Sequence, residues 1–564
     1  SMDRPSRSEI GVLVVGAGPT GLVMASELAA RGVSGRIIDR APVRSERSRA
    51  LVVQARSLEL LQKMGVADEL VARGRRTIKA TPFVEGRPAA NLEFGDIGVD
   101  DTPYPFLLFV SQAETERVLE KHLESLGAKV ERPVELLSFE GDAEGVSARL
   151  RHGDGRQETA RVRYLVGADG AHSTVRHTLG LSFKGDAYPQ DFVLADTEID
   201  WSGEDDRLYF FLSRKGLIAV FPLAGPSTYR LIATRAEDAP LDAGDPTLEE
   251  VQQLATELCP LPVRLYDPSW LARFRLHHRG VDSYRAGQAF VAGDAAHIHS
   301  PAGGQGMNTG IQDSYNLAWK LTLVIEGHAP DSILDSYHEE RHPIGQRLLR
   351  TTDRMFNVAA THNPLAIELR TFLMPRVLPR VMGKRSLRAR AFRFVSQLGI
   401  KYPDSPVVGE ELRGADQAFR RGPAAGHRAP DGPLRLAGEG RTISLFSRLR
   451  GIPHHLLLFD GSSPTTDGWD ASDAELRDLV TRYRGMIEPH RISDREPAQV
   501  AEIPVYVDES GLVHERYGLK GAGCYLLRPD GYVAFRAPGS DLRPVLAYLQ
   551  RTFPSPVPAE VPRS

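Results

Sequence analysis

Gly16-Ala-Gly-Pro-Thr-Gly21 decides the fold, because it joins an apolar run at Ile10–Val15 to a helix-like stretch at Thr20–Arg31. A short, nearly continuous apolar run is typical of a buried parallel strand. Glycines at this spacing let the backbone approach a pyrophosphate, and the following helix directs its N-terminal amides at the negative charge. Arg36–Asp39 is the returning strand, and Asp39 ends it where an acidic group can accept hydrogen bonds from ribose hydroxyls. We therefore predict a βαβ dinucleotide site, which by itself does not distinguish FAD from NAD.

A second glycine-rich segment follows a predicted strand at Gln288–Ala292 and reads Gly293-Asp-Ala-Ala-His-Ile-His-Ser-Pro-Ala-Gly-Gly-Gln-Gly-Met-Asn308. The strand delivers Asp294 to a glycine-flanked turn, where its carboxylate or backbone can hold a ribityl hydroxyl. A long helix predicted at Met307–Ile325 directs its N-terminal amides at negative charge, such as that on the N1/O2 edge of a reduced flavin. Two such segments predict one long cofactor held at both ends, and FAD meets that requirement.

The remaining patterns predict an α/β chain with an inserted antiparallel sheet. Amphipathic helices are predicted at Leu51–Met64 and Gln112–Leu126, and helices continue from the second glycine-rich segment to about residue 400. Between residues 181 and 279, β-rich segments alternate with Gly, Pro and Asp turns. These segments are Phe192–Ile199, Leu208–Leu212, Gly216–Pro222 and Tyr229–Thr234.

A Gly/Pro/Arg-rich passage at Arg420–Pro433 predicts a linker to a small C-terminal α/β unit. Its predicted elements are strands at Thr442–Phe446, His455–Phe459, Val500–Val507 and Cys524–Phe535 around a helix at Ala474–Tyr483. The expected organisation is a Rossmann-like FAD-binding domain of residues 8–180 and 280–400, a substrate-binding β-sheet domain of residues 181–279, and a C-terminal domain of residues 410–550.

Composition excludes several classes of protein. With 25% charged and 41% hydrophobic residues and a net charge of −3, the chain gives no sign of binding nucleic acid or an anionic membrane. It has two cysteines, without metal-ligand spacing, and no apolar run long enough for a transmembrane helix. Ser1-Met2 is typical of a tag-cleavage scar, and we see no signal peptide. We expect a cytoplasmic protein, as a monomer or homodimer.

Taken together, these segments resemble the group A flavoprotein monooxygenases, the para-hydroxybenzoate hydroxylase and phenol hydroxylase family, and most of all its aromatic polyketide hydroxylases. The resemblance covers roughly residues 8–400. The matching pieces are Gly16–Gly21, Asp39-Arg40, Ser48-Arg-Ala50, Arg56-Ser-Leu-Glu59, Gln112 with Glu116-Arg117, Gly167-Ala-Asp-Gly170 with Ser173 and Arg176, Gly293–Asn308 and Tyr337-His-Glu-Glu-Arg-His-Pro343.

The resemblance implies which residues hold the cofactor. Gly167–Gly170 would serve FAD and a visiting NAD(P)H, and Arg49, Gln112 and Arg117 would line the flavin pocket. A surface salt bridge remains the alternative for Arg49 and Arg117, and a cap at a strand end remains the alternative for Asp169. The full set of expected cofactor residues is Gly16, Gly18, Pro19, Thr20, Gly21, Asp39, Arg40, Arg49, Gln112, Arg117, Asp169, Gly293, Asp294, Pro301, Gly304, Gly306, Met307 and Asn308.

The resemblance also implies an FAD-dependent aromatic monooxygenase. NAD(P)H would reduce FAD, O2 would give a flavin C4a-hydroperoxide, and a phenolic, polycyclic substrate of the polyketide type would attack its distal oxygen. No GxSxG nucleophile motif is present, and Arg49 is the one weak candidate for a catalytic side chain. Such an enzyme would have its setting in antibiotic biosynthesis.

Aromatic residues of the inserted sheet are candidates for the substrate pocket. Tyr209 and Phe211 lie two apart, hence on one face of their strand, and Phe221 and Pro222 are further candidates for the wall. Aromatic-lined surfaces suit a flat polycyclic ligand. Ordinary sheet core is the alternative for each of them.

Three other functions compete with hydroxylation. Baeyer–Villiger oxygen insertion would use the same cofactors, and a redox-silent FAD scaffold could bind or cyclise a polyketide. A flavin-dependent halogenase would share the fold, but its Trp-x-Trp motif is missing and the four tryptophans are scattered.

Two histidine pairs invite interpretation as metal sites, and we predict none. His297 and His299 lack a third ligand, and His338-Glu-Glu-Arg-His342 matches the HExxH zinc signature but is followed at once by Pro343. Finally, Cys524–Arg536 resembles a segment of the thioredoxin-like domain of phenol hydroxylase relatives. Because the C-terminal domain lacks a CxxC motif, dithiol chemistry within it is excluded.

Overall fold

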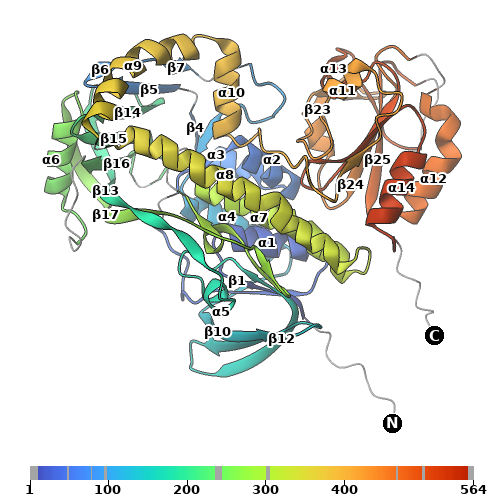
Figure 1. Cartoon of the computed structure of the whole chain (residues 1–564), viewed down its shortest axis with the longest axis horizontal. Helices are drawn as coiled ribbons and strands as arrows, with labels where there is room; N and C mark the ends of the chain where they lie inside the picture. The colour runs from blue at the N-terminus through green and yellow to red at the C-terminus, as the bar shows by residue number, and fades with distance from the viewer. Residues whose placement is uncertain are drawn as a thin grey trace.

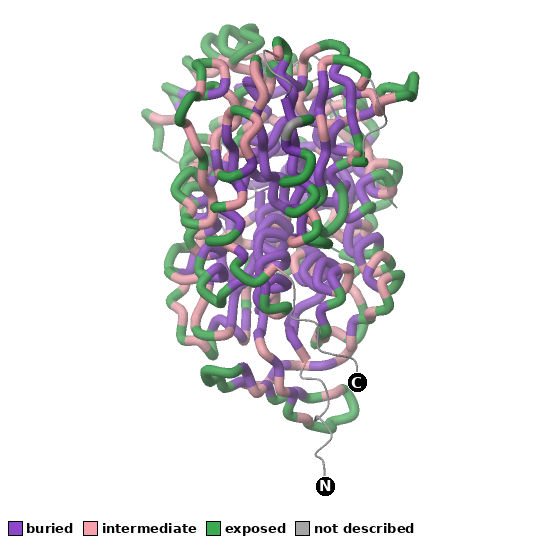
Figure 2. The backbone as a smooth tube through the Cα atoms, turned by 90° about the vertical axis from the view of Figure 1, so that its right-hand side faces the viewer, coloured by how far each residue is buried: buried purple, intermediate pink, exposed green. Residues whose placement is uncertain are grey.

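The described part of the chain forms three large β-sheets and one small sheet, with long helices crossing between them (Figure 1). The computed structural model describes residues 10–47, 50–77, 79–93, 98–225, 227–235, 244–299, 305–361, 363–464, 468–497 and 502–556. Within these ranges no helix combines the length and apolar character needed to cross a membrane. Buried residues concentrate along the central strands and on the helices that pack against them, whereas the outer turns are exposed (Figure 2).

The first sheet has a parallel centre that carries the predicted βαβ unit. Strand β1 (Ile10–Val15) begins and ends as predicted and pairs in parallel with β2 (Gly35–Ile38) and β12 (Gln157–Gly167). Five of its six residues are buried, because the strand has neighbours on both edges and packs against helix α1 (Pro19–Ala30). The other strands of this sheet are β9 (Val130–Glu131), β10 (Val134–Gly141), β11 (Val146–His152), β18 (Arg285–Ala286) and β19 (Ala289–Val291).

The second sheet is the predicted antiparallel insertion, extended at one edge by N-terminal residues. Its two longest strands, β13 (Phe183–Trp201) and β17 (Val263–Val281), pair along almost their whole length. One face is covered by α6 (Leu248–Leu258), a helix that the β-rich pattern did not predict. The remaining strands are β5 (Lys79–Val84), β6 (Arg87–Pro88), β7 (Leu92–Glu93), β14 (Arg207–Ser213), β15 (Gly216–Pro222), β16 (Tyr229–Arg235) and β20 (His297–Ile298).

Helices α7 (Gln305–Ile325) and α8 (Asp335–Ala359) cross the middle of the molecule between the sheets (Figure 1). The predicted helix at Leu51–Met64 was wrong at its start: Val52–Val53 form strand β3, and α2 runs from Ala55 to Met64. Strand β3 pairs with a neighbouring strand and is therefore unavailable to the helix. The other elements of this half are α3 (Ala67–Arg73), β4 (Arg75–Thr77), β8 (Leu107–Phe109), α4 (Gln112–Ser125), α5 (Thr174–Thr178), α9 (Pro364–Met382) and α10 (Arg385–Val395).

The third sheet forms the C-terminal unit, at the right of Figure 1. The segment predicted as a single strand at Cys524–Phe535 is a hairpin of β27 (Gly523–Leu527) and β28 (Val533–Pro538), because Gly531, at φ +82°, reverses the chain. The other elements are β21 (Gly409–Glu410), α11 (Gln417–Arg421), β22 (Pro433–Leu436), β23 (Thr442–Ser444), β24 (His454–Phe459), α12 (Asp473–Arg482), β25 (Ile487–Ser493), β26 (Val505–Val507), α13 (Leu512–Tyr517) and α14 (Arg543–Thr552).

The passage predicted as a linker, Arg420–Pro433, is instead packed against the first half of the chain. Arg428 is buried and donates to the Glu59 carboxylate at 2.5 and 2.8 Å and to Asp101 at 3.2 Å. The composition correctly indicated irregular backbone, but Arg428 of this passage meets the buried carboxylate of Glu59 and the half-buried carboxylate of Asp101. Such pairing fixes the passage in place.

A second ion network joins the C-terminal unit to the helices. Glu340 of α8 accepts hydrogen bonds from Lys320 at 2.7 Å and from Arg528 at 2.6 and 2.9 Å, and all three side chains are fully buried. Burial acts to raise the pKa of Glu340, but Arg528 and Lys320 outweigh it and hold that pKa well below its usual range. Arg528 also pairs with Asp530 at 2.6 Å, which balances its charge further.

We expect Glu340→Gln to destabilise the protein by about 3–5 kcal/mol, because two buried cations lose their shared carboxylate. The measurement is the free energy of unfolding from urea titration. Glu339→Gln, at the exposed neighbouring position, serves as the matched control and should change stability by less than about 0.5 kcal/mol. Equal stability of the two variants would contradict this account of the interface.

Candidate cofactor and substrate site

The three glycines of the first loop are required for different reasons. A Cβ at Gly16, where φ is +103°, would lie 2.2 Å from the carbonyl oxygen of Ala168, and one at Gly21 would lie 1.8 Å from that of Gly16. Close packing of strand, turn and helix therefore demands glycine at both positions. A Cβ at Gly18 would meet only the Glu116 carboxylate, at 3.8 Å, so this position faces open space.

That open space is a cavity of about 320 Å³ along the start of α1. Pro19 is the first residue of the helix, so the helix N-terminus faces the same opening as Gly18. Asp39 lies in the wall, where its carboxylate accepts hydrogen bonds from the backbone amides of Ala17 at 2.9 Å and Ala41 at 2.8 Å. Arg40, Arg44 and Arg132 provide positive charge around it, and Glu116 and Asp169 complete its polar wall.

The two glycine-rich segments meet at Thr20. Its Oγ1 would lie 2.7 Å from a Cβ at Gly293 and 2.3 Å from one at Gly310, so any larger residue at either position would push α1 and α7 apart. The carbonyl of Thr20 also accepts a hydrogen bond from Ser314 at 2.7 Å. We call Gly16–Gly21 with the start of α1 the first cradle, and Gly293–Asn308 with the start of α7 the second cradle. The two cradles are therefore in direct contact in the structure.

A buried carboxylate holds the second cradle in place. Asp313 of α7 lies 3.2 Å from the Gly293 amide, 2.6 Å from His297 Nε2 and 2.7 Å from Arg341 Nε. Burial acts to raise the pKa of Asp313, but Arg341 and His297 hold it below its ordinary value. Sequence reasoning missed Asp313. The family-like helix at Tyr337–Pro343, which contains Arg341, was the available signal.

Two groups of the second cradle could contact a ligand: the Asp294 carboxylate and the N-terminus of α7. Asp294 is exposed although its neighbours Gly293 and Ala295 are buried, so it reaches solvent from a deep position. The protein around it raises the pKa of its carboxyl, an effect that His297 partly offsets. At the start of α7, a Cβ at Gly306 would meet none of the described residues within 4 Å, so the described part of the chain leaves this side of the helix N-terminus uncovered.

Met307 and Asn308 contribute differently from each other. Met307 is half-buried and packs against the main core. Asn308 is buried, donates to the Val52 carbonyl at 2.8 Å and accepts from the Gln54 amide at 2.9 Å. Asn308 therefore anchors the residues before α2 at the start of α7.

Helix α4 separates the residues predicted on it. Gln112 donates to the Glu116 carboxylate at 3.1 Å, and Glu116 lines the cavity. Burial raises the pKa of Glu116 to about 7, which makes it a titratable group at the expected pyrophosphate end. Arg117, by contrast, is 48% exposed and pairs with Glu114 on the surface, as the salt-bridge alternative proposed. The sequence analysis included Glu116 in the family-like Gln112–Arg117 piece but did not predict it as a cofactor residue.

The Gly167–Gly170 turn is tied to the second cradle by Arg176. Asp169 accepts hydrogen bonds from Ser173 and from the Val175 amide, so it caps α5 while also lining the cavity. Burial raises its pKa, and these hydrogen bonds partly offset that effect. Arg176 donates to the carbonyls of Ala171 at 2.7 Å and Ala295 at 3.1 Å. Three of the predicted cofactor residues, Arg49, Pro301 and Gly304, lie outside the described residues.

Three of the predicted substrate residues, Tyr209, Phe211 and Pro222, lie on the face of the inserted sheet that α6 covers. Tyr209 and Phe211 are buried in the core beneath α6, together with Trp201. The antiparallel register sets Tyr209 opposite Val220, so the neighbouring Phe221 points to the other face. The prediction therefore combined residues of both faces, and ordinary sheet core is the correct account of the first two.

Phe221 packs against the hydrophobic core that includes strand β1 and helix α7, and it has aromatic neighbours there. Its ring lies 6.1 Å from that of Phe109 and 6.0 Å from that of Phe210, a residue the sequence analysis did not select. Pro222, directly opposite Tyr229, is buried at the end of β15 and shares the α6 face with Tyr209. Phe221, Arg230, Asp196 and Trp270 occupy directly opposed positions on four neighbouring strands.

Within that row, Arg230 and Asp196 form a buried, two-point ion pair at 2.7 and 2.9 Å. A bidentate pair of this kind fixes the guanidinium plane, and its Cζ lies 5.6 Å from the Trp270 ring centroid. The face opposite α6 thus combines aromatic rings with one rigid polar pair. That combination suits a flat ligand with oxygen substituents.

The HExxH histidines have other partners. Nδ1 of His338 accepts a hydrogen bond from the Tyr284 amide at 3.1 Å, and Nε2 of His342 lies 3.0 Å from the Val281 carbonyl. Between them, Arg341 supports the second cradle. The motif therefore serves to join α8 to β17 and to Asp313.

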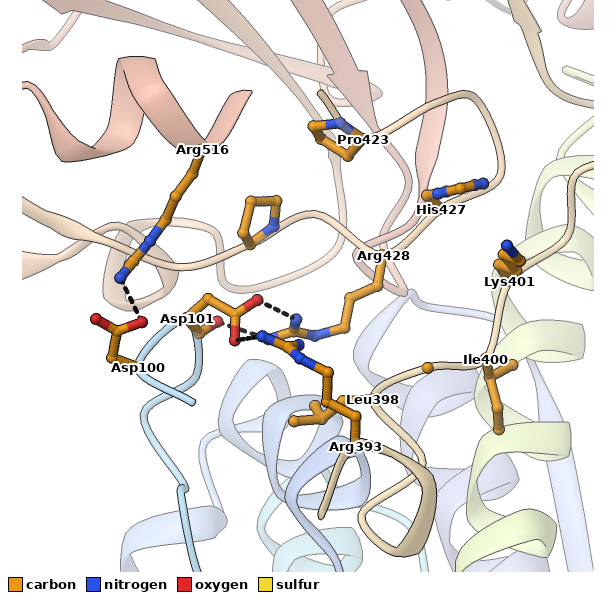
Figure 3. Close-up of a pocket in the computed structure, with 12 residues that line it drawn as sticks. Asp100, Asp101, Arg393, Leu398, Ile400, Lys401, Pro423, His427, Arg428 and Arg516 are labelled. Atoms are coloured by element: carbon orange, nitrogen blue, oxygen red, sulfur yellow. Dashed lines mark hydrogen bonds and ion pairs between the residues drawn. The ribbon is translucent and has the colours of Figure 1, made fainter. Parts of the chain in front are cut away.

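A further cavity, of about 470 Å³, lies between the two halves of the chain (Figure 3). Its walls carry two surface ion pairs, Asp101 with Arg393 at 2.8 Å and Asp100 with Arg516 at 2.8 Å. Lys401 and His427 line the same cavity from two connecting segments, as Figure 3 shows. The cavity is distinct from the cradle around Gly18.

The described residues fit an FAD molecule lying from Gly18 to Asp294. A pyrophosphate would find three suitable features here. Gly18 has no side chain to fill the space, the N-terminus of α1 faces it, and arginines lie nearby. Asp39 and Asp294 offer carboxylates for hydroxyl groups, and the open N-terminus of α7 suits a partial negative charge. The chemistry of this donor set matches that of the cofactor predicted from sequence.

Comparisons with known proteins agree with this arrangement. Residues 9–352 match the family described as FAD binding domain. The chain is 36% identical to 6-methylpretetramide 4-monooxygenase of Streptomyces rimosus over 96% of its own length and 93% of that protein.

Two solved structures extend the comparison. The ternary complex of aklavinone-11 hydroxylase with FAD and aklavinone is 26% identical with a TM-score of 0.73, covering 97% of this chain and 100% of that one. The Diels-Alderase PyrE3 from the biosynthetic pathway of pyrroindomycins is 27% identical with a TM-score of 0.66, also over 97% and 100% of the two chains.

We expect Gly18→Ala to weaken FAD binding by about tenfold or more without lowering the stability of the cofactor-free protein. The added methyl group meets open space rather than protein, so it occupies room that a pyrophosphate would use. Flavin fluorescence titration and thermal unfolding give the two measurements. Gly440→Ala, also in open space but far along the chain, is the control. A Gly18→Ala protein that binds FAD normally would contradict the assignment.

FAD binding should weaken several-fold as pH rises from about 6 to 8, because Glu116 ionises near pH 7 beside the expected pyrophosphate. The pKa is raised, so the neutral form dominates below it and repulsion appears above it. Titrations across this range measure the dependence. Glu116→Gln should bind FAD at pH 8 as tightly as the unmodified protein does at pH 6. A pH dependence that persists in this variant would assign it to another group.

Proposed function

Since this chain belongs to the FAD-binding domain family of flavin monooxygenases, we propose that it hydroxylates a phenolic, polycyclic aromatic compound of the polyketide type. NAD(P)H and O2 are the co-substrates of such an enzyme, and antibiotic biosynthesis is its setting. The relatives whose names carry this proposal act on 6-methylpretetramide and aklavinone, both polycyclic. The contact of Thr20 with Gly293 and Gly310 is the structural observation that supports it best, because it unites two cradles around one cofactor.

When bound, FAD supplies the redox chemistry that couples NAD(P)H oxidation to the activation of O2. The chain's own residues bind and orient it. The amides at the start of α1 and the glycine at position 18 would receive the pyrophosphate, and Asp39 would accept a hydrogen bond from a ribose hydroxyl. Asp294 would hold a hydroxyl of the ribityl chain, and the N-terminus of α7 would stabilise negative charge.

Substrate binding falls to the sheet face opposite α6. Phe221 and Phe210 offer apolar, aromatic surface for a polycyclic ring system and exclude water from it. The Arg230–Asp196 pair, rigid and desolvated, orients an oxygen substituent of that ring system. The deprotonation of the phenol has no assigned side chain.

We assign residues 8–180 and 280–400 to cofactor binding, residues 181–279 to substrate binding and residues 410–550 to a thioredoxin-like domain. The parallel strands β24 and β25 beside the antiparallel β27 and β28 support the last of these. Cys524 lies fully buried there, and burial raises its thiol pKa to about 12. That thiol is therefore unreactive, which leaves the domain a packing role.

The Diels-Alderase likeness favours one second candidate, a redox-silent FAD protein that cyclises its substrate. Such a protein would need the same cradle for FAD and the same apolar face. It would consume neither NAD(P)H nor O2. Baeyer–Villiger insertion remains the alternative that does consume both.

Turnover of the FAD-loaded protein with a panel of polycyclic phenols tests these functions against each other. We expect substrate to accelerate NAD(P)H oxidation, with one oxygen atom from isotopically labelled O2 entering a new ring hydroxyl. A ring-expanded lactone would replace hydroxylation by Baeyer–Villiger insertion. A product of unchanged mass without O2 uptake would overturn oxygenation and establish cyclisation.

Phe221→Ala should raise the KM of the active phenol by about tenfold, because the pocket loses an aromatic wall. The same variant should oxidise more NAD(P)H without forming product, since water gains access to the cofactor. Tyr209→Phe is the matched control, because this residue lies beneath α6 on the opposite face. If the control variant shows the larger change, the assignment of the two faces is wrong.

A further inference from the structure

Two histidines and a glutamate lie together in the C-terminal sheet, away from the cofactor site. His455 is on β24, and Glu488 and His490 are on the adjacent parallel strand β25. The register sets His455 beside Glu488, and His490 lies two residues further along the same strand. Because side chains alternate along a strand, all three project from one face of the sheet.

The ligand atoms of this trio are close to one another. Nδ1 of His455 lies 2.9 Å from Nε2 of His490, which lies 3.7 Å from Oε1 of Glu488. Both imidazoles are 1% exposed, whereas Glu488 is 49% exposed and opens the trio to solvent. In this arrangement the carboxylate lies at the protein surface and the two ring nitrogens lie in the interior.

The two nitrogens that would bind an ion face each other: Nδ1 of His455 and Nε2 of His490 are hydrogen-bond partners. In that hydrogen bond one nitrogen donates and the other accepts. An ion placed between them would instead be contacted by a lone pair of each ring.

We propose that His455, His490 and Glu488 bind a zinc ion, with water as the fourth ligand. Tetrahedral zinc with bonds of about 2.0–2.1 Å needs its ligand atoms about 3.3 Å apart. The His455–His490 separation of 2.9 Å and the His490–Glu488 separation of 3.7 Å fall on either side of that value. Two imidazoles and one carboxylate are a ligand set that zinc accepts.

Among the parts of the chain that the structure describes, this trio is the one group of three or more candidate ligands close enough to share an ion. The sequence alone drew attention to His297–His299 and His338–His342 instead. In those pairs, His297 contacts Asp313, and His338 and His342 contact backbone groups. A bound ion would join β24 to β25 close to the helices that hold the cofactor, and its role there is structural.

The test is isothermal titration of the FAD-loaded full-length protein with Zn²⁺, after removal of metal with a chelator. We expect one ion per chain and a higher melting temperature in its presence. Glu488→Gln should bind zinc about tenfold more weakly or worse, and His490→Gln should lose the site. Glu475→Gln, an exposed residue of the same domain, is the control and should bind like the unmodified protein.

X-ray absorption of the zinc-loaded protein provides a readout that does not depend on a variant folding. Two imidazole nitrogens and one or two oxygen atoms around the ion would support the site. An absence of binding would overturn the proposal, as would binding that Glu488→Gln and His490→Gln leave unchanged. These experiments measure zinc binding and not turnover, so their result is independent of the proposed monooxygenase activity.

Discussion

Helices α1 and α7 approach each other through the side chain of Thr20, which packs where Gly293 and Gly310 carry no side chain. That contact sets the distance between two helix N-termini that must serve a single cofactor. Asp313 adds to it by holding the second glycine loop to α7 through the Gly293 amide. A buried carboxylate would ordinarily be costly, and Arg341 and His297 offset the cost. Removal of Asp313 would leave the buried guanidinium of Arg341 without its carboxylate partner.

The same principle governs the junction with the C-terminal unit. Glu340 is shared by Lys320 and Arg528, and Arg428 reaches across to Glu59. Buried ion pairs contribute little net stability compared with apolar residues of the same volume, but they are intolerant of mismatch. They therefore specify one docking geometry for the two halves. The irregular passage at Arg420–Pro433 is ordered by this pairing rather than by secondary structure.

In the inserted sheet, the face to which a side chain points decides whether the residue fills the core or can contact a ligand. Tyr209 and Phe211 fill the core beneath α6, whereas Phe210 and Phe221 point to the other face. A shift of one residue along a strand exchanges the two faces completely. The helix that covers one face, α6, comes from a different part of the insertion, so the buried face could not be chosen from the strands alone.

The sequence by itself determined the βαβ opening, the two glycine-rich segments, the cofactor and the family, because each depends on local spacing that only a few backbone arrangements satisfy. It also placed Asp39 and Asp294 just beyond strands β2 and β19 and predicted Ser173 as the N-cap of α5. The tertiary structure alone decided that Asn308 anchors β3, that Arg117 faces solvent and that Glu116 titrates near neutral pH. Only it brought together His455 and His490. These outcomes rest on contacts between segments distant in the chain, and no local pattern records which partner a side chain will meet.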